Sequence, residues 1–169
     1  MKGIKLFCIV VGVYLLQTVL VQEITFLGIS PNLFLVVTCG ISFLFGSTTG
    51  GVCGLVFGLL QDMNIGRMIG LNGFLFMHIG IIMGQFNKRF FKDNYVVAVT
   101  FIVLSTMVYE LIVYILGAFI YSQDIMFGTL AVKILIRAFL NAITGIIVYP
   151  ILLKINIGVE VDRRIFGGR

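Results

Sequence analysis

The sequence predicts an all-α integral membrane protein whose six transmembrane helices form one bundle. Three observations lead to this fold class. Hydrophobic residues make up 60% of the 169 residues and charged residues only 11%, whereas a soluble domain is about 45–50% apolar and about 25% charged. The apolar residues form six runs, and the basic residues lie in small clusters between them. We therefore expect one transmembrane domain over residues 1–153 and a short basic cytoplasmic tail over residues 154–169.

Six apolar segments are the expected helices, and they cover residues 4–22, 31–46, 50–61, 71–87, 95–121 and 128–153. A helix that crosses the bilayer needs about 20 residues, within a range of roughly 17–25. The first, second and fourth segments fit or nearly fit this length, and the last two are long enough to tilt. The third segment is too short to be assigned by its length alone.

The positions of the basic residues decide whether the third segment crosses the membrane. With six crossings and a cytoplasmic N-terminus, nine of the twelve Lys and Arg residues face the cytoplasm, as the positive-inside rule requires. These nine are Lys2, Lys5, Lys88, Arg89, Lys92, Lys154, Arg163, Arg164 and Arg169. Merging the second and third segments would move the basic loop at residues 88–92 to the outside. We predict six crossings with both termini in the cytoplasm, and this placement explains the formal charge of +5 without a nucleic-acid partner.

Glycine recurs at every fourth position around the third segment, at Gly46, Gly50, Gly54 and Gly58. This spacing places glycines on one face of a helix, where another backbone can approach closely; such packing is a main source of helix association in lipid. Residues 46–51 are rich in turn formers, so the first one or two glycines should belong to a turn. Gly50, Gly54 and Gly58 should then line a short helix inside the bundle. Packing within the chain is the favoured role of this face, and a groove for another protein's helix or a ligand path are the alternatives.

Asp62 occupies the next position of the glycine register, at the expected outer end of the third helix. A carboxylate at the C-terminus of a helix opposes the helix dipole, so it needs a favourable partner. Arg67 or a backbone amide of the following loop could supply that partner. We expect Asp62 to fix the loop rather than to perform chemistry.

The residues around Asp62 also carry a resemblance. Gly58-Leu59-Leu60-Gln61-Asp62 is followed by Gly70-Leu71-Asn72, and Pro31-Asn32-Leu33 opens the second segment. Together these residues resemble the signature of the rod shape-determining protein MreD family. The resemblance covers nearly the whole chain, although the motif is loose and hydrophobic.

The resemblance implies a non-enzymatic scaffold of the cell-elongation machinery in the bacterial cytoplasmic membrane. Its implied partners are an MreC-like protein, directly, and MreB filaments and peptidoglycan synthases, indirectly, besides membrane lipids. The family is also similar in fold to the substrate-binding subunits of energy-coupling-factor transporters. A solute-binding transporter subunit is therefore the alternative function, although the first segment lacks the Ala-x-x-x-Ala surface by which such subunits dock.

The last two segments carry charges at membrane depth, where ionisable groups usually face protein or water. At a rise of about 1.5 Å per residue, Glu110 lies roughly 16 Å from the outer end of its segment and Arg137 roughly 13 Å from the outer end of the next. This match in depth predicts an ion pair. Lys133, about 7 Å from the outer end, can extend towards the interface, and Asn141 continues the same face. A polar site for a partner helix, a lipid or a solute is the alternative.

No set of residues predicts an active site, a cofactor or a metal site. His78 is the sole histidine, and we expect it to be packed or hydrogen-bonded. Asp62 and Asp124 both lie near the outer face, as in a membrane aspartyl protease, but neither has the flanking motif. The cysteines Cys8, Cys39 and Cys53 lie within apolar runs and form no metal-binding pair.

Overall fold

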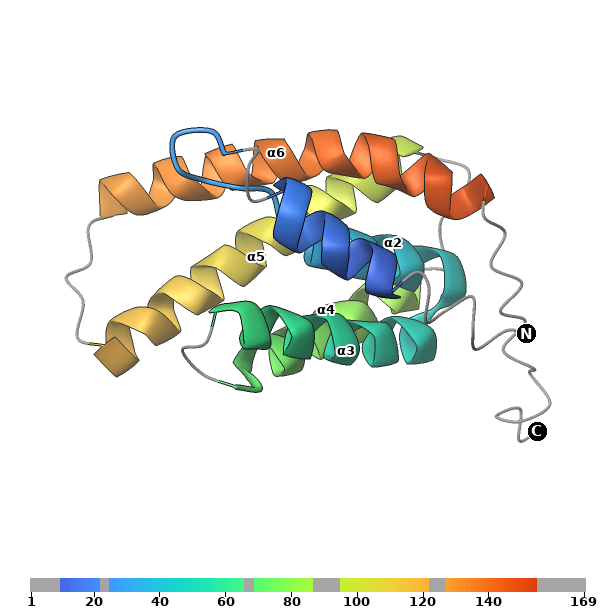
Figure 1. Cartoon of the computed structure of the whole chain (residues 1–169), viewed down its shortest axis with the longest axis horizontal. Coiled ribbons are helices and arrows are strands. Elements are labelled where there is room, and N and C mark those ends of the chain that lie inside the picture. Colours follow the sequence, from blue (N-terminus) through green and yellow to red (C-terminus); the bar gives the residue numbers. More distant parts are fainter. Residues whose placement is uncertain (1–9, 22–24, 66–68, 87–94, 122–126, 155–169) are drawn as a thin grey trace.

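The computed structural model describes residues 10–21, 25–65, 69–86, 95–121 and 127–154 (Figure 1). This part of the chain is built of helices, with no strand beyond one isolated β-bridge between Phe26 and Ile29. The predicted all-α class is confirmed for these residues. The basic loop at residues 88–92 and the tail at residues 155–169 lie outside the described residues.

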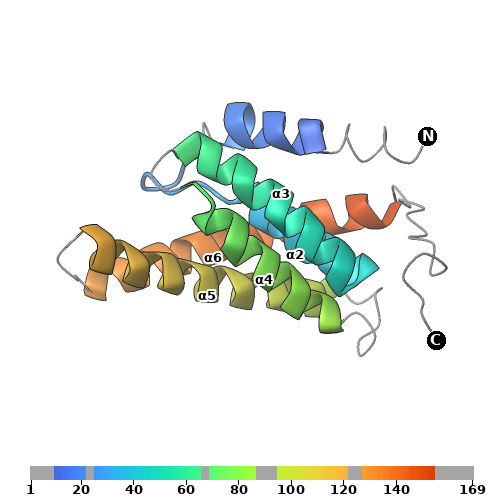
Figure 2. The same cartoon turned by 90° about the horizontal axis from the view of Figure 1, so that it is seen from below.

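Helices lie along all six predicted segments, and those of the second, fourth, fifth and sixth segments begin and end close to the predicted positions. The first is α-helical over residues 10–15 and π-helical over Leu16–Val21 (η1). The others are α2 (Leu33–Phe45), α3 (Ser47–Ile65), α4 (Leu71–Gln85), α5 (Tyr95–Tyr121) and α6 (Phe127–Lys154). Successive helices run in opposite directions along the long axis (Figure 1). Figure 2 shows the first helix and the α5–α6 pair on opposite sides of the molecule.

Helix α2 is the centre of the bundle. Every residue from Leu33 to Leu44 is buried, and α2 contacts η1, α3, α4, α5 and α6. Its sequence has no charged residue, and a helix that is apolar on all faces is stable only when it is surrounded. Its two hydroxyl side chains bond within the helix, Thr38 to the carbonyl of Phe34 and Ser42 to that of Thr38, so they leave no unpaired donor in the core.

The prediction that the third helix is short and lies inside the bundle was wrong. Helix α3 has 19 residues, and Val52, Val56 and Met63 on its outer face are exposed. The predicted turn over residues 46–51 is a single residue, because Gly46 at φ +94° reverses the chain and its N–H caps the carbonyl of Ser42 at 2.8 Å. A glycine accepts this left-handed backbone without strain, so α3 begins directly at Ser47.

Two of the described helices are long and apolar enough to cross a bilayer, over Tyr95–Phe119 in α5 and Gly128–Lys154 in α6. Three shorter apolar helices cover Val10–Val19, Leu33–Phe45 and Leu71–Gln85. At about 1.5 Å per residue, α2 spans only about 20 Å of a hydrocarbon layer of about 30 Å. Because α2 is enclosed by other helices, it does not need to match the thickness of the lipid. Six crossings therefore remain a prediction.

Candidate functional site

The glycine face of α3 packs directly on the backbone of α4. A β-carbon at Gly54 would overlap the carbonyl oxygen of Phe76, and one at Gly58 would overlap the carbonyl oxygen of Asn72. A β-carbon at Gly50 would meet the side chain of Ser42 on α2. The register therefore lets α3 lie against its neighbours at distances that no side chain permits.

Helix α4 also has glycines on the face that contacts α3. A β-carbon at Gly80 would overlap the carbonyl oxygen of Gly50, and one at Gly84 would overlap the backbone of Ser47. The sequence analysis did not use this second pair, although Gly80 and Gly84 are also four residues apart. The two glycine faces pack against each other. The space beside Gly50, Gly54 and Gly58 is therefore occupied by α4 and by Ser42 of α2.

Asp62 closes the hairpin formed by α3 and α4, because it lies on α3 and caps the N-terminus of α4. Its side chain is buried, with 2% of the residue exposed. Oδ2 accepts hydrogen bonds from the backbone N–H groups of Gly70 at 2.9 Å and Gly73 at 3.1 Å. Oδ1 accepts from the backbone N–H of Asn72 at 3.1 Å and from its Nδ2 at 2.8 Å.

These four bonds explain why an acid is found at the end of the glycine register. Asp62 opposes the dipole of α3, but its carboxylate lies at the positive end of α4 and satisfies amides that have no partner within that helix. Gly70, the N-cap residue of α4, has φ +100° and no side chain to cap with, so the cap comes from α3. The partners are loop and helix amides, one of the two options predicted, whereas Arg67 lies outside the described residues.

Asn72 extends this cap to α5. Its Nδ2 donates to Asp62, and its Oδ1 accepts from the hydroxyl of Tyr109 at 2.7 Å. Tyr109 is 4% exposed and stacks edge-on against Phe76. A chain of buried hydrogen bonds thus joins α3, α4 and α5. Tyr109 was not singled out from the sequence, because a tyrosine within an apolar run carries no signal of a partner.

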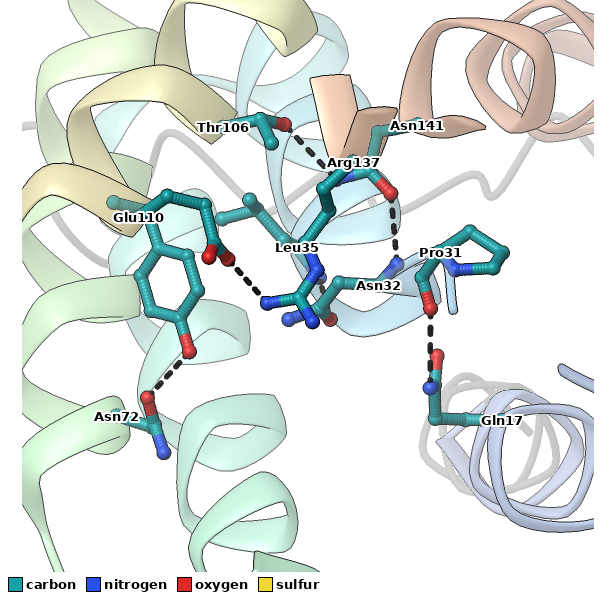
Figure 3. A network of polar contacts seen from close by, with 10 residues as sticks. Gln17, Pro31, Asn32, Leu35, Asn72, Thr106, Glu110, Arg137 and Asn141 are labelled. Carbon is teal, nitrogen blue, oxygen red and sulfur yellow. Dashed lines mark hydrogen bonds and ion pairs between the residues drawn. The ribbon is translucent and has the colours of Figure 1, made fainter. Parts of the chain in front are cut away.

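The N-terminus of α2 is capped by side chains from α6 and η1 and by its own N-cap residue (Figure 3). The N–H of Asn32 donates to Oδ1 of Asn141 on α6 at 2.7 Å, and the N–H of Leu33 donates to Oε1 of Gln17 on η1 at 2.6 Å. Asn32 itself accepts from the N–H of Leu35 at 3.1 Å. Gln17 also donates to the carbonyl of Pro31 at 3.4 Å. A helix that begins in the core needs such caps, because water cannot reach its first amides.

Asn141 is fully buried and is also bonded through its amide nitrogen. Nδ2 donates to Oγ1 of Thr106 on α5 at 2.9 Å, and Thr106 in turn donates to the carbonyl of Ile102. One side chain therefore holds α2, α5 and α6 together. Gln17 and Thr106 were missed from the sequence, because a single polar residue in an apolar run does not reveal which distant amide it meets.

The structure brings together the two charges that match in depth. Nη1 of Arg137 on α6 lies 2.6 Å from Oε1 of Glu110 on α5 (Figure 3). The side chains are 31% and 13% exposed, respectively. Nε of Arg137 is buried and has no hydrogen-bond partner among the described residues. Lys133 takes no part in the pair; it is exposed and forms no ion pair with any residue that the structure describes.

The other predicted residues lie apart from these sites. His78 is exposed on α4, where Nδ1 lies 2.9 Å from the carbonyl oxygen of Phe74 and the ring packs on that of Phe74. Cys39 and Cys53 are buried free thiols, while Cys8 lies outside the described residues. Within the described ranges, no three His, Cys, Asp or Glu side chains gather as metal ligands would.

The exposed apolar helix faces, together with two described helices long enough to cross a bilayer, fit a helical membrane protein. The model of the family described as rod shape-determining protein MreD matches residues 2–156, and the chain therefore belongs to this family. Membership makes it a membrane protein with a role in determining rod shape. Neither the curated proteins nor the solved structures contain a match, so the similarity to energy-coupling-factor subunits remains a prediction.

The residues that carry the predicted resemblance lie at the two capping sites. Pro31 and Asn32 lie at the start of α2, and Asp62 on α3 caps the start of α4 at Gly70 and Asn72. Gly58 lies against the carbonyl of Asn72. These residues therefore lie at helix junctions of the bundle, and their place in a family signature stays a prediction.

Proposed function

We propose that the chain is a non-enzymatic scaffold of the bacterial cell-elongation complex. It binds an MreC-like protein in the membrane and through it connects MreB filaments with peptidoglycan synthases. Membership of the MreD family over residues 2–156 is the observation that carries this proposal.

The use of the polar side chains supports a scaffold. Asp62, Asn72 and Asn141 are buried, and their hydrogen bonds run between helices or to a helix terminus. Groups used in this way stabilise one arrangement of the bundle. A fixed arrangement of helices is what a scaffold presents to its partners.

The outer faces of the helices suit association within the membrane. Leu104 and Val108 on α5 and Leu135 and Phe139 on α6 are each more than half exposed. In lipid these apolar faces are stable, and complementary packing lets a partner helix bind to them. We propose six crossings with both termini in the cytoplasm, which agrees with the alternating directions of the helices in Figure 1.

Purification of the tagged full chain from membranes, together with restoration of rod shape, tests the proposal. The chain should retain an MreC-like protein and should return cells that lack the family member from spheres to rods. Gly117→Ala, whose added methyl group meets nothing within 4 Å, is the control substitution and should leave both results unchanged. If the folded chain neither retains the MreC-like protein nor restores shape, the proposal is wrong.

A further inference from the structure

A groove of about 520 Å³ lies between the turn at residues 26–29 and the first turns of α6. Leu27 and Ile29 line it from the turn, and Val132 and Ile136 line it from α6. Its volume is within the range of ligand pockets, roughly 300–1,000 Å³. Lys133 is the one charged residue among the described residues that line it.

The charge of Lys133 is not balanced by any residue that the structure describes. Its side chain is exposed, and no carboxylate forms an ion pair with it there. Arg137, one turn further along α6, differs because Glu110 pairs with it at 2.6 Å. The groove is therefore characterised by an apolar wall beside an ammonium group that has no ion pair among the described residues.

The backbone at Leu27, in the turn that closes the bridge between Phe26 and Ile29, has a conformation that is unusual for leucine. Leu27 has φ +53°, the left-handed conformation that a residue with a β-carbon adopts at a cost, and it is the only non-glycine with positive φ among the described residues. It is 76% exposed, so burial within the chain does not account for a leucine there. Strained residues of this kind concentrate at sites where a ligand is held.

We propose that the groove binds one anionic phospholipid. Lys133 pairs with the phosphate, and an acyl chain lies along Leu27, Val132 and Ile136. Lys133 is about 7 Å along α6 from Gly128, so its long side chain can reach the polar boundary where lipid phosphates lie. A partner helix fits less well, because the groove covers only the first turns of α6 whereas a helix would pack along a longer stripe.

Quenching of a single tryptophan by brominated lipid tests the proposal on the full chain in bilayers. The chain contains no tryptophan, so Val132→Trp reports on the groove alone. Phe139→Trp, at a position that is 66% exposed on α6 and outside the groove, reports on the surrounding lipid. Brominated phosphatidylglycerol diluted into phosphatidylcholine should bind about five-fold more tightly at position 132, the effect of one favourable lysine–lipid contact. At position 139 the two lipids should bind equally.

Three variants in the Val132→Trp background separate the contributions. Lys133→Gln should abolish the preference for phosphatidylglycerol, whereas Lys133→Arg should keep it. Leu27→Asn retains the left-handed turn, which Asn tolerates, but removes the apolar wall; it should weaken binding of both lipids. Should Lys133→Gln fail to accumulate, the comparison of the two lipids at positions 132 and 139 decides the question.

Equal quenching at positions 132 and 139, or a preference that survives Lys133→Gln, would overturn the proposal. It would also be overturned if an MreC-like protein shielded position 132 while phosphatidylglycerol showed no preference there, since the groove would then belong to a protein partner. The measurement needs only that the chain is embedded in lipid, so its outcome is independent of the scaffold function.

Discussion

Asp62 lies in the last turn of α3, yet its carboxylate accepts a hydrogen bond from the backbone N–H of Gly73, in the first turn of α4, at 3.1 Å. Asp62 thus ends the glycine face of α3 and caps the N-terminus of α4. The contact joins the two central features of the sequence, the four-residue glycine period and the acid that follows it. It also gives a physical role to four of the residues predicted to form the family signature, because Gly58, Asp62, Gly70 and Asn72 meet at this junction.

Replacing the cap should destabilise the hairpin. Asp62→Asn keeps the size of the side chain but replaces one acceptor oxygen by a donor, which leaves buried amides of α4 without a partner. We expect a loss of about 1–3 kcal/mol, measured as a lower melting temperature in detergent. Met63→Ala, at the neighbouring position, which is 74% exposed, serves as the control. A variant Asp62→Asn as stable as the parent would show that the cap is dispensable.

Adding even one methyl group to the glycine face of α3 should destabilise the protein. Gly54→Ala would place a β-carbon against the backbone of Phe76, which cannot move aside as a side chain can. We expect a loss on the order of 1–3 kcal/mol, and Gly54→Leu should fail to accumulate in membranes.

The matched control for this prediction is Gly117→Ala on α5, where a β-carbon meets nothing within 4 Å. Because alanine is the better helix former, this variant should be neutral or more stable by up to about 1 kcal/mol. Equal effects of the two substitutions on the melting temperature would mean that backbone flexibility, and not the α3–α4 contact, determines the result.

Glu110 and Arg137 should behave as a coupled pair. Glu110→Gln and Arg137→Gln each leave one charge without its partner inside the bundle, and such a change costs about 3–5 kcal/mol at buried sites. The partial exposure of both side chains places the expected loss at the lower end of this range. The double variant should recover much of the loss, as melting temperatures of the two single variants and the double variant would show.

Lys154→Gln is the control for this cycle, because Lys154 is exposed at the end of α6 and forms no ion pair with any described residue, and it should change stability little. The exchange Glu110→Arg with Arg137→Glu should be more stable than either reversed charge alone. Strict additivity of the two single losses would end the pairing interpretation.

Topology follows from the distribution of basic residues and is open to a labelling experiment. Single cysteines at Asn64 and Asn87, in a chain without Cys8, Cys39 and Cys53, should differ in access to an impermeant thiol reagent. We expect labelling from outside at position 64 only, because the positive-inside rule predicts a cytoplasmic location for the basic loop after position 87. Labelling at 87 but not at 64 would overturn the six-crossing arrangement.

The fold could be predicted from the sequence where the signal is local. Apolar runs gave helices whose ends agree with the structure to within a few residues for α2, α4, α5 and α6. Depth along two antiparallel helices was enough to place Glu110 opposite Arg137, because the rise per residue is fixed.

The rest depends on contacts between residues that are far apart in the chain. Asn141 caps Asn32 across 109 positions, and no periodicity connects the two. The central position of α2 was missed because segment length was used as the guide, whereas an uninterrupted apolar surface on all faces decides which helix is enclosed. Gly80 and Gly84 were overlooked although their spacing repeats that of the opposite face.

The scaffold function is tested most directly by photo-crosslinking in living cells. A photoreactive residue is placed in turn at exposed positions on different helices, namely Val52, Ile82, Leu104 and Ile147, and at Phe34, which is fully buried in α2. Our account expects an adduct with the MreC-like protein from positions on one face of the bundle and none from Phe34. If no exposed position forms that adduct while the chain is folded and restores rod shape, the chain acts without binding this partner and the central claim fails.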